Sequence, residues 1–185
     1  MALRPLALVA LVLLWIGTAA RAAEPAFSDR QVEAAFLYNF AKFIEWPDSA
    51  LGEGQPIVVG VVGEDPFGQD LDDTLAGKRI GGHPLRVERF SRPSDVARCH
   101  ILFIPASATP HLRDILDHLR EKPTLTVGDS PDFVESGGMI GFVIADRRVR
   151  FDIDFRTMRG AGLKPSSQLL KVARRVIEAP RGDDR

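Results

Sequence analysis

This 185-residue sequence contains one cysteine, few long apolar runs and no surplus of basic residues. The one cysteine, Cys99, cannot form an intramolecular disulfide. It directly precedes the apolar run Ile101–Ile104, so we expect a buried, inert thiol rather than a reactive one. The 24 basic and 25 acidic residues leave no positive excess, which argues against a general nucleic-acid-binding protein.

Recognisable catalytic and metal-binding motifs are absent as well. The sequence has no G-x-S-x-G, Walker or zinc-ligand pattern and no cysteine–histidine signature, and no carboxylate pair has a spacing typical of acid–base catalysis. His111, Asp114 and His118 share one side of a predicted helix, but His111 and His118 are seven positions apart. That separation is about 10.5 Å along a helix, too far for two ligands of one zinc ion. We therefore predict no metal, no cofactor and no enzymatic activity.

The only long apolar run lies at the N-terminus and has the pattern of a signal peptide. Arg4 precedes the run Leu6–Ile16, and Ala20-Arg21-Ala22 is a small-residue cleavage pattern. A retained membrane anchor is the alternative, but a spanning helix needs about 20 apolar residues. We expect residues 1–22 to be a cleaved signal, 23–180 one domain without a membrane span, and 181–185 a polar tail.

The mature chain reads as alternating helices and strands. Ser28 and Gln31 form a capping box for a helix that runs to Trp46-Pro47, with Asn39 near the middle of its apolar face. Apolar runs predict buried strands at 57–62, 101–104 and 124–127, and alternation predicts another at 85–90. Asp65 is expected to cap a helix that begins at Pro66 and ends near Leu75, and a second helix is expected at 111–120.

The C-terminal part predicts a hairpin followed by a last helix. Residues 139–145 and 149–155 form its strands, with a turn at 146–148, and the returning strand alternates apolar and charged residues as an edge strand does. The last helix is expected from Ser166 to Ile177. Together these elements predict an α/β fold with a mixed, mainly parallel sheet, helices on both faces and a C-terminal β-hairpin.

Two surface features are candidate binding sites for a partner or ligand. The predicted last helix would present Lys171, Arg174 and Arg175 opposite its apolar stripe, with Lys164 nearby. A plain solvated face is the alternative, since charged helix faces are ordinarily only wet. Trp46 lies at a helix end before a proline, and aromatic residues there suit a partly exposed binding contact.

Six ordered sequence blocks resemble the YfiR-like family of periplasmic regulators. They are Ala34–Pro47, Val59–Gly68, Cys99–Ile104, Thr126–Asp129, Gly137–Phe142 and Gly162–Leu170. The resemblance implies a Rossmann-like three-layer sandwich and a homodimer. Asn39, Asp65, Gly138 and Gly141 are expected to have structural roles. It also implies binding to the periplasmic domain of an inner-membrane diguanylate cyclase or histidine kinase, which would be held inactive. Family members can carry additional cysteines that pair, whereas this chain has Cys99 alone.

Three hypotheses follow for the function. The first is a periplasmic repressor of a membrane signalling protein that controls cyclic di-GMP and biofilm. The second is a periplasmic small-molecule-binding sensor module. The third, ranked last, is an enzyme on the same scaffold.

Overall fold

The computed structural model describes residues 27–96 and 98–178. The predicted signal peptide (1–22) and polar tail (181–185) lie outside these ranges. Among the helices of the described residues, none combines the length and the apolarity that a membrane crossing requires.

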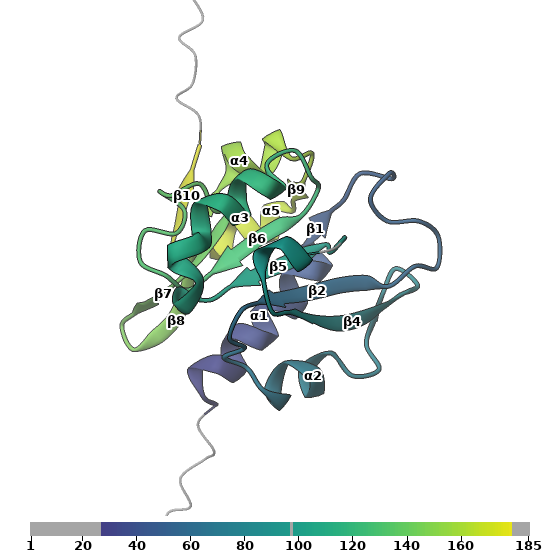
Figure 1. The fold of residues 1–185 in the computed structure, drawn as a ribbon, viewed down its shortest axis with the longest axis horizontal. Helices are drawn as coiled ribbons and strands as arrows, with labels where there is room; N and C mark the ends of the chain where they lie inside the picture. The colour runs from purple at the N-terminus through teal and green to yellow at the C-terminus, as the bar shows by residue number, and fades with distance from the viewer. Residues whose placement is uncertain (1–26, 97, 179–185) are drawn as a thin grey trace, which may run out of the picture.

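The described chain alternates helices and strands along its length (Figure 1). The N-terminal half contains α1 (Asp29–Phe43), β1 (Ile44–Glu45), β2 (Ile57–Val62), α2 (Gln69–Leu75), β3 (Arg79–Ile80), β4 (His83–Phe90) and the short 3₁₀ helix η1 (Pro93–Asp95). The second half contains β5 (Ile101–Ile104), η2 (Ala106–His111), α3 (Leu112–Leu119), β6 (Leu125–Gly128), β7 (Ile140–Ala145), β8 (Arg148–Asp154), α4 (Phe155–Gly160), β9 (Lys164–Pro165), α5 (Ser167–Val172) and β10 (Arg175–Ile177).

One eight-stranded mixed sheet organises the domain, in the order β10-β8-β7-β6-β5-β2-β4-β3. The neighbouring pairs from β4 to β7 are all parallel, which gives the strand order of a doubly wound, Rossmann-like fold. Only β7–β8 and β3–β4 are antiparallel. The predicted mixed, mainly parallel α/β sheet is therefore confirmed.

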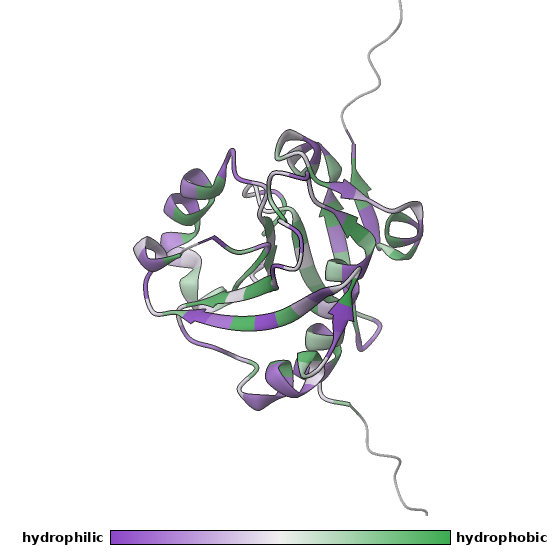
Figure 2. Ribbon diagram, turned by 90° about the vertical axis from the view of Figure 1, so that its right-hand side faces the viewer, coloured by the Kyte–Doolittle hydropathy of each residue, from purple (hydrophilic) through white to green (hydrophobic). Residues whose placement is uncertain are grey.

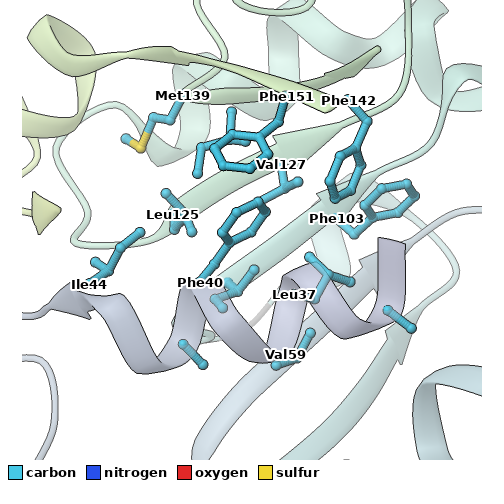
Figure 3. Packing of buried hydrophobic residues seen from close by; sticks show 14 of the residues in the cluster. Leu37, Phe40, Ile44, Val59, Phe103, Leu125, Val127, Met139, Phe142 and Phe151 are labelled. Carbon is cyan, nitrogen blue, oxygen red and sulfur yellow. The ribbon is translucent and has the colours of Figure 1, made fainter. Parts of the chain in front are cut away.

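Each face of the sheet carries its own apolar core. On one face α1 packs Leu37 and Phe40 against aromatic side chains of the sheet, among them Phe142 and Phe151 (Figure 3). The opposite face packs against α3 through a separate cluster of buried residues. The central strands β2 and β5 consist mainly of hydrophobic residues (Figure 2), and their side chains are buried on both sides of the sheet. This is the predicted three-layer arrangement.

Helix α1 begins as predicted but ends earlier. The Ser28–Gln31 capping box is present in both directions. The helix stops at Phe43 because Ile44 is extended and pairs as β1 with β9. Its buried face is also rotated from the predicted one, since Leu37 is buried whereas Asn39 is partly exposed. The prediction that Asn39 sits in the middle of the apolar face was wrong.

Asp65 stabilises a turn rather than a helix start. Its Oδ1 accepts a hydrogen bond from the backbone N–H of Phe67 at 2.8 Å, while its Oδ2 lies 2.7 Å from Nε of Arg89. Helix α2 begins only after Gly68, whose φ of +53° is incompatible with an earlier helical start. The predicted helix end at Leu75 is confirmed.

The predicted hairpin is confirmed as β7–β8, with a tighter turn than expected. Asp146 and Arg147 both have positive φ, at 52° and 58°, as a two-residue type I′ turn requires. The returning strand is not an edge strand, because β10 pairs alongside it in parallel. Asp152, expected on a wet face, is consequently only 1% exposed.

The predicted last helix is half as long as expected. Ser166 caps α5 by accepting from the N–H of Leu169, but Ala173 is extended and the chain continues as β10. The extended course lets Val176 and Ile177 pair with β8, so β-branched residues end in a sheet. The proposed basic helix face therefore does not exist as one surface.

Two of the glycines predicted to be structural pack beside Phe133. A Cβ on Gly138 would lie 2.1 Å from Cε1 of the Phe133 ring, and one on Gly141 would lie 3.4 Å from its Cβ. The turn that carries Phe133, residues 131–137, can pack this closely on residue 138 only because that position lacks a side chain, whereas a Cβ at position 141 would make an ordinary contact.

Candidate functional site

A two-stranded ribbon brings two of the candidate binding residues together. Strands β1 and β9 pair antiparallel with Glu45 opposite Lys164, so Trp46 follows directly beside Lys164's strand. The backbone N–H of Ser166 donates to the carbonyl of Phe43 at 2.8 Å and fixes the register. Trp46 and Lys164, 118 positions apart in the sequence, thus lie on neighbouring segments of the ribbon.

Trp46 is partly buried and is held by a hydrogen bond. Its indole N–H donates to the backbone carbonyl of His100 at 3.3 Å, and the two rings meet edge to face with centroids 5.9 Å apart. One part of the indole therefore packs against the domain and another part remains accessible. This fits a preorganised contact residue, because little side-chain freedom would be lost on binding.

His100 fixes the loop that follows Trp46. Its Nδ1 accepts the backbone N–H of Val58 at 3.0 Å, which leaves Nε2 to donate to the carbonyl of Ala50 at 3.1 Å. Burial lowers the pKa of His100, so the imidazole stays neutral and keeps both bonds. Sequence reasoning treated His100 as isolated, since no local pattern reveals partners 42 and 50 residues away.

The C-terminal segment supplies the exposed part of the site. Lys164 and Lys171 are both exposed, and Val172 is 59% exposed, one of the large hydrophobic side chains with the greatest exposure. We define the β1–β9/α5 surface as Trp46, Lys164, Lys171 and Val172. It combines an aromatic anchor, an apolar side chain and two cations, beside the exposed carboxylate of Glu45 opposite Lys164. This composition suits contact with a partly apolar protein surface that carries charge.

Arg174 and Arg175, also predicted as binding residues, lie just before and at the start of β10 and make internal ion pairs. Their Nε atoms lie 2.7 and 2.9 Å from the two carboxylate oxygens of Asp152, and Arg175 also pairs with Glu135. Burial raises the pKa of Asp152, but the two guanidinium groups outweigh it, so the pKa of Asp152 is lowered. These arginines hold the C-terminal strand on the sheet.

A second buried charge cluster, missed by sequence reasoning, lies at the other end of α1. Arg30 Nη1 lies 2.7 Å from both Glu33 Oε2 and Asp129 Oδ2, and Asp129 also accepts the backbone N–H of Ala106. Glu33 is only 4% exposed, and this desolvation raises its pKa to about 7 despite the opposing effect of Arg30. The sequence signal that could have revealed this cluster is Glu33, an acidic residue among the apolar positions of the helix.

The remaining candidates for chemistry are inert or dispersed. Cys99 is buried, as predicted, and burial raises the pKa of its thiol to about 12. Within residues 27–96 and 98–178 no three His, Cys, Asp or Glu side chains are grouped so that they could hold a metal ion. His118 Nε2 instead lies 2.9 Å from Nζ of Lys122.

Comparison with known proteins identifies a family and a fold. The model of the family described as YfiR/HmsC-like matches residues 30–174, most of the described chain. No curated protein matches the sequence significantly.

Two solved structures share the fold at low sequence identity. A conserved domain protein from Vibrio cholerae O1 biovar El Tor is 11% identical over 77% of this chain, with a TM-score of 0.55. The ABC domain in complex with L-Trp from Streptococcus pneumonia is 13% identical over 80% of this chain, with a TM-score of 0.51. In both cases the alignment covers 60% of the other chain, and the likeness concerns the fold.

Proposed function

The chain belongs to the YfiR/HmsC-like family, and from this premise we propose that it is an exported, non-enzymatic regulator that represses an inner-membrane signalling protein from the periplasm. The proposed target is a diguanylate cyclase, whose restraint would limit cyclic di-GMP and biofilm formation. A histidine kinase with a periplasmic sensor domain is the alternative target.

The observation that supports the proposal is the pairing of β1 with β9, which sets Glu45 opposite the exposed Lys164 and so brings the partly exposed Trp46, the residue after Glu45, to the end of the same ribbon. Lys171 and Val172 are exposed on α5, the helix that follows β9. Hot spots in protein interfaces are commonly aromatic, and flanking cations select an acidic partner surface. Binding would repress the target only if the surface has a higher affinity for the inactive state than for the active one.

Export and self-association are part of the same proposal. The signal-like segment 1–22 would direct the chain to the periplasm, where the domain acts after cleavage. A homodimer would present two copies of the β1–β9/α5 surface, which suits a dimeric membrane target. The second candidate function, a small-molecule sensor module, is favoured by a charged cavity described below.

The test is deletion of the gene, with cyclic di-GMP measured before and after, together with pull-down of the exported protein from membranes. We expect the nucleotide to rise on deletion and an inner-membrane protein with a cyclase output to be captured. Complementation with Lys164→Glu/Lys171→Glu should fail to restore repression, whereas the matched control Arg147→Glu/Arg150→Glu, on the β7–β8 hairpin, should restore it. Unchanged cyclic di-GMP and an empty pull-down would refute the proposal.

A further inference from the structure

A cavity of about 480 Å³ opens behind the β1–β9/α5 surface, at the amino ends of β5 and β6. Its lining includes Ser49, Arg98, Cys99, His100, Lys122 and Thr124. The volume lies within the range of about 300–1,000 Å³ that is usual for small-molecule sites. The loop after β1 forms one wall, and the segments before β5 and β6 form the others.

The charge of the lining is of one sign. Arg98 and Lys122 contribute two cations, and no carboxylate lines the cavity. The ion pairs formed among the described residues use other cations. Lys122 Nζ contacts Nε2 of His118, and an ammonium with three N–H groups keeps donors for a ligand beside that contact. Glu88, whose charge helps to raise the pKa of Cys99, is paired with Arg86. By contrast, the groove between α1 and α2 is lined by Asp70 and Asp73 and no cation.

His100 and Thr124 have no side-chain donor left for an anion in the cavity. Both ring nitrogens of His100 are occupied by backbone groups of β2 and of the loop after β1. The Thr124 hydroxyl donates to the carbonyl of Cys99 at 2.8 Å. Polar recognition must therefore come from Arg98, Lys122 and Ser49, while Ala50 and Pro123 supply apolar wall.

We propose that this cavity binds a small organic anion, with Arg98 and Lys122 holding a carboxylate or phosphate and the apolar walls enclosing a flat hydrophobic body. Two cations without a carboxylate select charge, and the mixed walls favour an aromatic acid over an inorganic ion. This site goes beyond the repression proposed above, because it needs no protein partner.

The geometry also links the site to the partner surface. Ser49, which lines the cavity, precedes Ala50, and the carbonyl of Ala50 accepts a hydrogen bond from Nε2 of His100. The carbonyl of His100 in turn accepts a hydrogen bond from the indole N–H of Trp46. Trp46 is the one tryptophan of the described residues, since the sequence has two and the other is Trp15. Its fluorescence therefore reports on occupancy of the cavity.

The experiment is titration of the purified mature protein with benzoate and phenylphosphate, followed by Trp46 fluorescence and by calorimetry. We expect saturable binding of at least one anion, weaker binding at higher salt, and no binding of the neutral analogue benzyl alcohol. Arg98→Gln/Lys122→Gln should weaken binding at least ten-fold. The charge-matched control Arg147→Gln/Arg150→Gln should bind as the unaltered protein does.

Both cations are exposed, so the variants should keep the thermal midpoint of the unaltered protein, which a melt would verify. Absence of saturable binding by either anion would overturn the proposal. Equal affinity in the two double variants, or equal affinity for benzyl alcohol, would overturn it as well. Because the assay contains no membrane partner, failure here is distinct from failure of the proposed repression.

Discussion

Arg174 Nε lies 2.7 Å from Oδ1 of Asp152, a carboxylate that is only 1% exposed although its strand alternates as a surface strand would. Arg175 reaches the other oxygen, so two consecutive arginines at the start of the last strand neutralise one buried charge. The arginine side chains are themselves almost half exposed. Because only the carboxylate is buried, substitution of the arginines and substitution of Asp152 should lower the free energy of unfolding by different amounts.

Removing the arginines should therefore destabilise the protein more than removing the acid. Arg174→Gln/Arg175→Gln leaves Asp152 buried and without its cations, which we expect to cost about 3 kcal/mol. Asp152→Asn frees two arginines that can turn to water, at a cost of about 1 kcal/mol. Urea unfolding at pH 7 measures both values. The double variant should regain stability on acidification as Asp152 becomes protonated, and a larger loss in Asp152→Asn would contradict this reasoning.

Glu33 should make stability fall as the pH rises from about 4.5 to 7. Its folded-state pKa, about 7, lies above the ordinary value of 4.5, so the folded protein holds a proton that the unfolded chain releases. The stability from the protonated form is fully present below pH 4.5 and is lost as the pH passes 7, by at most ~3 kcal/mol. Glu33→Gln should flatten this part of a pH–stability curve measured by urea unfolding; an unchanged slope would count against the assignment.

Gly138→Ala should destabilise the fold strongly. The added methyl would meet the ring of Phe133, itself 1% exposed, so the turn over β7 must shift, at an expected cost of about 1–3 kcal/mol. Gly160→Ala is the matched control, because its Cβ would meet nothing within 4 Å. Comparison of their thermal midpoints tests the packing argument, which equal midpoints would exclude.

Cys99 should resist thiol reagents in the native protein. The pKa of about 12 leaves almost no thiolate at pH 8, and the buried side chain is inaccessible. A chromogenic disulfide reagent should react slowly under native conditions and at the rate of a free thiol in denaturant. Rapid native labelling would show that the strand carrying Cys99 opens readily.

The positions of the central strands and of the hairpin could be predicted from sequence. Strands buried on both faces, such as Ile101–Ile104, need continuous apolar runs, and no other element produces a run so short between turn signals. The capping box at Ser28 is equally local, because both of its hydrogen bonds join residues three apart.

The predictions were wrong where the local sequence is compatible with two different conformations. The segment 173–177 has apolar residues at helical spacing and is also rich in β-branched residues, so its conformation depends on whether a strand is available to pair with it. Asp65 can cap a helix or a turn, and the positive φ of Gly68 selects the turn. The candidate binding residues also differ in outcome. Trp46 and Lys164 lie on neighbouring segments of the β1–β9 ribbon, whereas Arg174 and Arg175 form ion pairs with Asp152 inside the domain.

By itself the sequence determined the layered α/β architecture, because burial on one or two faces imposes a periodicity that neighbouring residues display. Only the tertiary structure decided which charges are paired and which stay free. Asp152 and Arg174 lie 22 residues apart, and Trp46 and His100 lie 54 apart, so their contacts depend on strand order and register. Such long-range neighbours leave no trace in local spacing, and they determine which side chains remain free to bind another molecule.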